Sequence, residues 1–155
     1  MDDAEKRRLY RLNIAKWDID KAVELLTAAV NHKPPSLEFE ALVMSGIIHY
    51  ARPFSYNEKK KDAQADPRVP QEVTANLSDS ELKLHDLLLE RRNKAIAHSE
   101  WEKFPVGIDM ETKVLSSRRY SVYPEFLDVQ PTLALARKLL DRLHNMVADH
   151  VFKLP

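Results

Sequence analysis

Apolar side chains recur every three or four residues over four stretches of the chain, and this spacing predicts four helices. The first stretch, residues 3–32, carries one stripe of large aliphatic side chains: Leu9, Leu12, Ile19, Val23, Leu26 and Val30. Trp17 widens the stripe, and we expect it in the core or at a dimer seam rather than as a base-stacking platform. Because proline cannot continue a helix, Pro34 and Pro35 end this one.

The other three predicted helices have recognisable starts or ends. Ser36 is a good N-cap for a helix over 37–51, and Ser78 with Glu81 forms a capping box for a helix over 79–98. Pro131 suits the first turn of a last helix over 131–151. Gly46, next to Ser45, is small enough to let a neighbouring backbone approach the second helix.

Two stretches lack helical periodicity. Residues 55–76 are polar and contain three consecutive lysines and several prolines, which predicts a long irregular loop. Residues 104–123 alternate short β-prone runs with turn residues, which predicts a small hairpin. The fold class expected is therefore all-α, with residues 1–155 forming a single up-and-down four-helix bundle.

Composition narrows the class of protein. The chain has 155 residues, two glycines and no cysteine, so disulfides and thiolate zinc sites are excluded and helices are favoured over tightly turned sheets. Charged residues make up 31%, mean hydropathy is −0.46, and no apolar run approaches the roughly 20 residues that span a bilayer. The acidic start lacks a secretory profile. We therefore expect a soluble cytoplasmic protein. We also expect no metal or cofactor, because no phosphate loop or metal-ligand spacing is present.

The charges balance, with 24 basic and 24 acidic side chains, so any contact with nucleic acid must come from local clusters. Four basic clusters stand out in the chain: Arg7-Arg8-Arg11, Lys59-Lys60-Lys61, Arg91-Arg92-Lys94 and Arg118-Arg119. For the first, second and fourth, a solvated surface is the favoured interpretation. The third cluster, Arg91-Arg92-Lys94, lies at the end of a predicted apolar helix, immediately before Ala95-Ile96-Ala97-His98. A helix that only has to bury one face does not need this cluster.

This segment resembles a known family. The run Arg92-Asn93-Lys94-Ala95-Ile96-Ala97-His98 is similar to the arginine, four to six residues, histidine motif of HEPN domains, and Ile-Ala-His-Ser resembles solitary bacterial HEPN proteins, some linked to phage defence. Tyr50 to Ser55, at the end of the second helix, fits the same group. The resemblance implies a compact helical bundle, a homodimer and a metal-independent endoribonuclease, or a relative that has lost activity and only binds.

The residue types suit that chemistry. Histidine near neutral pKa can deprotonate a ribose 2′-hydroxyl, which assigns this role to His98. A permanently charged, planar guanidinium stabilises the phosphate oxygens, which assigns that role to Arg92. Asn93, Arg91, Lys94 and Ser99 are supporting or RNA-binding candidates. Arg52, at the end of the second helix, either reaches the same cleft or caps the helix carbonyls. The expected products carry 2′,3′-cyclic phosphate and 5′-hydroxyl ends.

Helix geometry leaves the choice of arginine open. At about 100° per residue, Arg91 and His98 share a helix face, whereas Arg92 and His98 are about 120° apart on an unbroken helix. The resemblance nevertheless points to Arg92, because Asn93 follows it. The conflict is removed if the helix ends before His98, or if the site is completed by a second copy of the chain across a two-fold axis.

Three hypotheses follow from the sequence. The first is a HEPN-like endoribonuclease acting in phage defence or as a toxin, with RNA as substrate and an antitoxin or regulatory protein as a further partner. The second is a HEPN-like dimeric module that binds RNA or protein without cleavage. The third is a helical protein in which Arg92 and His98 only pair and cap a helix. Glu100 stands where toxins of the family often carry a tyrosine, so the resemblance does not extend to control through that residue.

Overall fold

The computed structural model describes residues 2–55, 68–93, 106–108, 111–112, 115–117 and 126–152. The helices in this part of the chain are α1 (Asp3–Ala29), α2 (Leu37–Ala51), α3 (Asp79–Arg91) and α4 (Gln130–Val151), with short 3-10 helices η1 (Arg52–Phe54) and η2 (Gln71–Val73). Strands β1 (Val106–Ile108) and β2 (Leu115–Ser117) pair antiparallel, with Gly107 opposite Ser116. The fold is mostly helical, as the sequence predicts.

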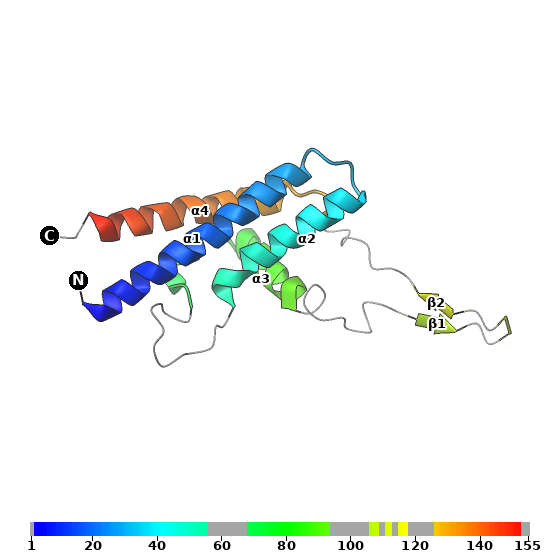
Figure 1. Ribbon diagram of the computed structural model, residues 1–155, viewed down its shortest axis with the longest axis horizontal. Coiled ribbons are helices and arrows are strands. Elements are labelled where there is room, and N and C mark those ends of the chain that lie inside the picture. The colour runs from blue at the N-terminus through cyan, green and yellow to red at the C-terminus, as the bar shows by residue number, and fades with distance from the viewer. Residues whose placement is uncertain are drawn as a thin grey trace.

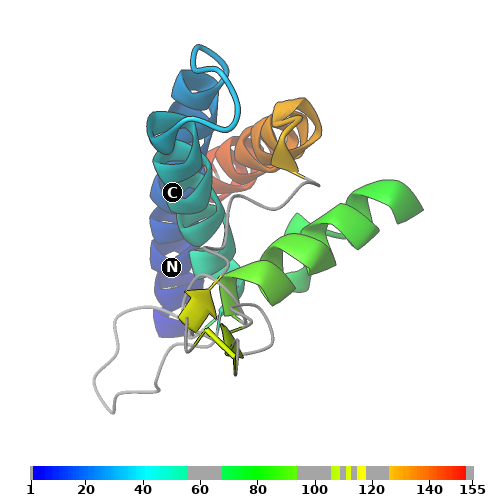
Figure 2. The ribbon, with the colours of Figure 1, turned by 90° about the vertical axis from the view of Figure 1, so that its right-hand side faces the viewer.

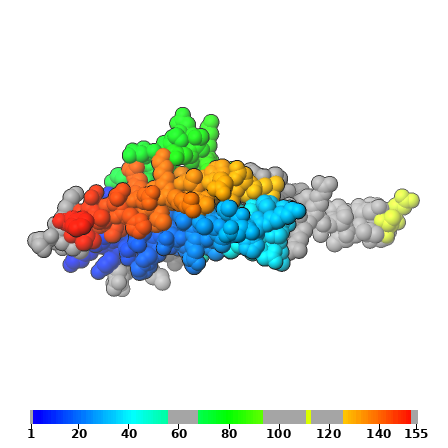
Figure 3. Space-filling view, turned by 90° about the horizontal axis from the view of Figure 1, so that it is seen from above, coloured from blue at the N-terminus to red at the C-terminus, as the bar shows by residue number. Residues whose placement is uncertain are grey.

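Helix α1 is the centre of the arrangement (Figure 1). It packs between α2 and α4, and both of these run antiparallel to it. Helix α3 crosses this layer at a steep angle and stands out from it (Figures 2 and 3). No helix in the described ranges has the length and apolar character needed to cross a membrane.

The core forms where the inward face of α1 meets its two neighbours. Leucines and isoleucine alternate with alanines along this face, all fully buried: Leu12, Ala15, Ile19, Ala22, Leu26 and Ala29. Opposite them lie α2 residues such as Phe39 and Ile47 and α4 residues such as Leu139 and Leu143. Each large buried aliphatic side chain contributes about 1.5–3 kcal/mol to folding. The alanines of α1 are short enough to let the neighbouring helices approach closely.

Helices α1 and α2 pack closely at Gly46. A Cβ atom added to Gly46 would lie 2.8 Å from Leu26 Cγ and 3.7 Å from the Ala22 carbonyl oxygen. The tightest neighbour is therefore the Leu26 side chain, and the α1 backbone at Ala22 also approaches, as the sequence suggested. A side chain at position 46 would force Leu26 to move.

The predicted helix starts are confirmed. The Ser36 side chain accepts a hydrogen bond from the Phe39 amide at 3.2 Å, and Pro131 lies in the first turn of α4. Ser78 and Glu81 form the capping box. Glu81 also binds Lys138 Nζ of α4 at 2.7 Å, and Lys138 together with the Ser78 amide lowers the pKa of Glu81 to about 2. The start of α3 is thereby fixed to α4.

Several details differ from the sequence prediction. Helix α1 ends at Ala29 rather than at His32, because the chain turns there, and Val30 is 43% exposed instead of buried. Trp17 is 62% exposed, so a core position for it is wrong. Residues 68–76 are not simply irregular, since Val73 of η2 is fully buried in the core. Residues 56–67 of the predicted loop lie outside the described residues.

His85 of α3 is buried and hydrogen bonded. Its Nδ1 lies 2.8 Å from Tyr50 Oη of α2, and Phe54 packs against its ring edge-to-face at 4.6 Å between centroids. Burial lowers the pKa of His85 and raises that of the Tyr50 hydroxyl, so both groups are held neutral. This pair fixes α3 against the end of α2.

Candidate functional site

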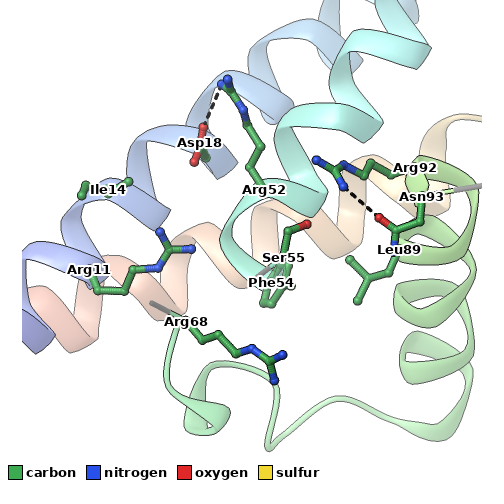
Figure 4. A pocket seen from close by; sticks show the side chains of 10 residues that line it. All are labelled: Arg11, Ile14, Asp18, Arg52, Phe54, Ser55, Arg68, Leu89, Arg92 and Asn93. Atoms are coloured by element: carbon green, nitrogen blue, oxygen red, sulfur yellow. Dashed lines mark hydrogen bonds and ion pairs between the residues drawn. The ribbon is translucent and has the colours of Figure 1, made fainter. Parts of the chain in front are cut away.

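A cavity of about 520 Å³ lies where the first half of α1, the end of α2 and the end of α3 come together (Figure 4). The described part of its walls carries four arginines, one carboxylate and a few neutral side chains: Arg11, Ile14, Asp18, Arg52, Phe54, Ser55, Arg68, Leu89, Arg92 and Asn93. Arg11, Ile14 and Asp18 come from α1, while Arg92 and Asn93 follow α3. Segments far apart in the sequence thus supply one concentrated group of guanidinium ions.

Arg11 is the most buried of the four arginines, with 4% of its surface exposed. Its Nη2 donates to the Pro53 carbonyl at 2.6 Å, but its buried Nε has no hydrogen-bond partner. Burial lowers the pKa of Arg11, while the charge of Asp18 opposes this shift. Burying the charge of an arginine is costly, and the charge of an anion bound in the cavity would offset part of that cost.

Arg52 and Asp18 form the polar contact between α1 and α2 at the cavity. Arg52 Nη1 lies 3.4 Å from Asp18 Oδ1, and the His49 ring nitrogen Nδ1 lies 3.4 Å from the guanidinium and 3.6 Å from the same carboxylate. The Arg52 side chain therefore reaches across to α1 and the cavity instead of capping the carbonyls of α2. Asp18 holds it in place.

Arg92 and Asn93 close the opposite wall in a π-helical turn that continues α3. Arg92 Nη1 donates to Asn93 Oδ1 at 2.9 Å, and Figure 4 shows the guanidinium directed into the space shared with Ser55 and Arg52. Arg68, from the segment before η2, lies below it in the same view. Arg91 does not line the cavity. Of the two adjacent arginines, the one facing the other cations is therefore Arg92.

The described walls carry a strong excess of positive charge. Four arginines against the single carboxylate Asp18 leave a formal charge of +3 on the described walls. Charges gathered around a concave surface attract anions more strongly than the same charges on a flat surface. Arginine forks match the geometry of phosphate oxygens. The arrangement is suited to binding a phosphate or another compact anion.

The structure brings together three of the predicted site residues, Arg52, Arg92 and Asn93. His98, Lys94 and Ser99 lie outside the described residues, so the spacing between Arg92 and His98 stays a prediction. Arg118-Arg119 and Lys59-Lys60-Lys61 lie outside them as well.

The sequence prediction did not single out Asp18, Ser55 or Arg68 as site residues. It favoured a solvated surface for the cluster that contains Arg11, and this is wrong for Arg11, which is 4% exposed. A signal for Arg11 was present: it stands four residues before Ala15 and eleven before Ala22, on the face of α1 that is otherwise fully buried. A charged residue on a buried face calls for a specific partner. Nothing in the local sequence marked Arg68.

Comparison with known proteins identifies no relative. No protein-family model, no curated protein and no solved structure matches this chain.

Proposed function

We propose that this protein is a HEPN-like, metal-independent endoribonuclease whose arginine-lined cavity holds the phosphate that is cleaved. The observation that carries the proposal is the position of Arg92. The arginine of the Arg-x5-His motif faces the same cavity as Arg11, Arg52 and Arg68, whereas its neighbour Arg91 does not. This is the arrangement that a motif built to handle phosphate requires.

In the proposed reaction the ribose 2′-hydroxyl attacks the adjacent phosphorus. The proton of the hydroxyl passes to His98, the bond between O2′ and phosphorus forms, and the bond from phosphorus to O5′ breaks. The departing oxygen takes up a proton from solvent water and becomes the 5′-hydroxyl, His98 returns its proton to solvent, and the other fragment keeps a 2′,3′-cyclic phosphate. Arg92 and Arg11 stabilise the negative charge that grows on the phosphate oxygens, and Arg52, held by Asp18, adds to the field.

The cavity dimensions agree with this role. About 520 Å³ lies within the ordinary range for sites that hold a small organic group, roughly 300–1,000 Å³. Arg11, the most buried arginine of the described wall, adds its positive charge to the cavity. We propose that two copies of the chain join so that His98 of one protomer serves the phosphate held beside Arg92.

Labelled single-stranded RNA incubated with the protein in EDTA tests the enzymatic proposal. We expect wild type to cut the RNA into fragments with cyclic phosphate ends and His98→Ala to leave it intact. The matched control is His144→Ala on α4, an exposed histidine outside the cavity wall, which should cut like wild type. RNA that stays whole with wild type over a diverse pool, or equal cutting by His98→Ala, would overturn the proposal.

A second candidate is an RNA-binding module without nuclease activity. It is favoured by one observation: the described cavity wall carries four arginines, and guanidinium groups bind phosphate without any catalytic group. This candidate predicts that RNA binds, that binding weakens with rising salt because phosphate contacts release counterions, and that the RNA is recovered uncut.

A further inference from the structure

Helix α1 carries a row of large apolar side chains that the core does not use. Tyr10 is 49% exposed, Ile14 39% and Trp17 62%. Their spacing of four and three residues puts them within about 60° of arc on one face of the helix. Single exposed apolar residues are ordinary on protein surfaces, but an aligned row that includes two aromatics indicates an interaction site. We call these three residues the α1 stripe.

The α1 stripe is continuous with the cavity. Ile14 belongs to both, and the cavity residues Arg11 and Asp18 occupy the neighbouring arc of the same helix (Figure 4). A ligand that leaves the cavity over α1 therefore meets Ile14 first, and the two aromatic side chains lie one turn from it on either side.

Basic residues stand at both ends of the α1 stripe. Arg7 lies three residues before Tyr10, and Lys21 lies four residues after Trp17, so both share its face of the helix. Lys21 forms an ion pair with Glu24 at 2.7 Å, but both side chains are exposed, and such pairs are weak. Aromatic side chains between cations, beside a positively charged cavity, are the combination by which proteins bind single-stranded nucleic acid.

We propose that the α1 stripe stacks the bases of a single-stranded RNA whose phosphate lies in the cavity. This inference rests on the proposed function for its substrate class and adds the form of the substrate. Tyr10 and Trp17 lie roughly 10 Å apart along the helix axis, which lets them contact different nucleotides of one strand. Aromatic rings stack on every base, so the contact selects unstacked single strands over duplex without requiring a particular sequence.

A second copy of this chain suits the α1 stripe less well. A second copy of the stripe would cover the apolar side chains, but it supplies no negative charge to the adjacent cavity, whose described walls carry a formal charge of +3. A nucleic acid strand covers the same apolar side chains and supplies the negative charge that the cavity attracts.

Fluorescence of Trp17 tests the inference directly. The chain contains two tryptophans, so Trp101→Phe leaves Trp17 as the only one. This variant is titrated with a 2′-O-methyl RNA hexamer, which cannot be cleaved, and with inorganic polyphosphate of similar charge. We expect the RNA to quench Trp17 emission and polyphosphate to bind without quenching, because only the RNA carries bases.

Affinity measurements on substituted proteins complete the test. Trp17→Ala should bind the hexamer about tenfold more weakly, within the range for loss of one stacked base, and should bind polyphosphate like wild type. The matched control is Leu37→Ala at the start of α2, a 67% exposed apolar residue that does not line the cavity and should leave both affinities unchanged.

Unchanged emission with RNA, or equal RNA affinity of wild type and Trp17→Ala, would overturn the stacking role. A change from dimer to monomer in Trp17→Ala at unchanged RNA affinity would overturn it in favour of a seam between copies. These outcomes are separate from the nuclease proposal. If RNA quenches Trp17 emission but the protein never cuts RNA, base stacking on the α1 stripe is supported and the nuclease proposal fails. The protein is then the non-catalytic RNA-binding module.

Discussion

Helices α1 and α2 meet in two regions of opposite character. At one, Leu26 fills the space that a side chain at Gly46 would need, and the contact is wholly apolar. At the other, Asp18 contacts Arg52 and His49, and the buried Arg11 donates to the Pro53 carbonyl. Because the helices are antiparallel, the start of α1 and the end of α2 together build the second region. Close packing and charged contacts are thus found in different parts of the α1–α2 interface.

The apolar region contributes mainly to stability, and the polar region is the part suited to binding. The apolar region contributes folding free energy through close packing, which tolerates no added volume. The polar region carries a desolvated arginine and an excess of like charges, which lower stability unless an anion is bound. Substitutions in the first region should change stability and leave RNA contacts intact, and substitutions in the second should do the reverse.

Leu26→Ala should have the largest effect on the apolar region. Removing a fully buried leucine leaves a cavity, so the free energy of unfolding should fall by about 2–5 kcal/mol. Chemical denaturation measures this loss. RNA binding, measured where the variant is still folded, should stay within twofold of wild type. A large loss of RNA affinity in the folded variant would contradict the separation of the two regions.

Arg92→Ala should have the largest effect on the polar region. The loss of a charged donor to the transition state should reduce the rate of RNA cleavage by about 10²–10³-fold, with little change in stability because the side chain is not in the core. Arg91→Ala is the matched control, since Arg91 is the adjacent arginine and lies outside the cavity wall. Single-turnover cleavage rates decide the question, and equal losses in both variants would show that the cavity does not distinguish them.

Gly46→Ala tests the contact between Gly46 and Leu26 in the apolar region. The added Cβ would lie 2.8 Å from Leu26 Cγ, so a buried side chain must move. Overpacking costs about 1–3 kcal/mol and the better helix propensity of alanine returns about 1 kcal/mol, which leaves a net loss of about 1 kcal/mol. In a Leu26→Ala background the same substitution should stabilise the protein. Equal effects in both backgrounds would contradict the contact.

The fold could be predicted from the sequence only in part. The helix starts at Ser36, Ser78 and Pro131 depend on residues within one turn, so the sequence predicted them correctly. Trp17 was misplaced because a hydrophobic stripe records which residues are apolar, while burial depends on the neighbours that tertiary packing brings. Val73 was missed because no periodic pattern surrounds it.

The candidate site was predictable only in part, for the same reason. Arg92 and Asn93 stand in a continuous motif, and Arg52 stands at a helix end, so each could be named from local sequence. The cavity also requires Arg11 and Arg68, which lie far from the motif in the chain and reach it only through the antiparallel pairing of α1 with α2 and the crossing of α3. Such convergence is a property of the fold.

Asp18→Asn tests the charge balance of the polar region with a smaller effect. Asp18 is the carboxylate of the described cavity wall, and it holds Arg52 at 3.4 Å. Removing its charge frees Arg52 and raises the field on an anion, so RNA should bind about two- to fivefold more tightly, with a loss in stability of less than about 1 kcal/mol. Fluorescence anisotropy at fixed salt measures the affinity. Weaker binding would show that Asp18 organises the cavity more than it opposes RNA.

The smallest expected effect is a pH dependence at His85, which lies outside both regions and serves as a check on α3. Burial lowers the pKa of His85 below 6.5, so the unfolded chain binds more protons between the folded pKa and 6.5. Stability should therefore fall as the pH drops below 6.5, by less than about 1.4 kcal/mol per pH unit for one proton. His85→Gln should show a shallower decline in denaturation experiments at pH 7 to 5. Identical slopes would contradict the buried, neutral state of His85.

The central claim is that the arginine-lined cavity holds the phosphate of an RNA strand. A crystal structure of the protein with a single-stranded RNA, 2′-deoxy at the cleavage position so that the attacking hydroxyl is absent, tests it most directly. We predict a phosphate within hydrogen-bonding distance of Arg11 and Arg92, inside the cavity. A strand bound elsewhere on the protein, with the cavity free of phosphate, would contradict the account.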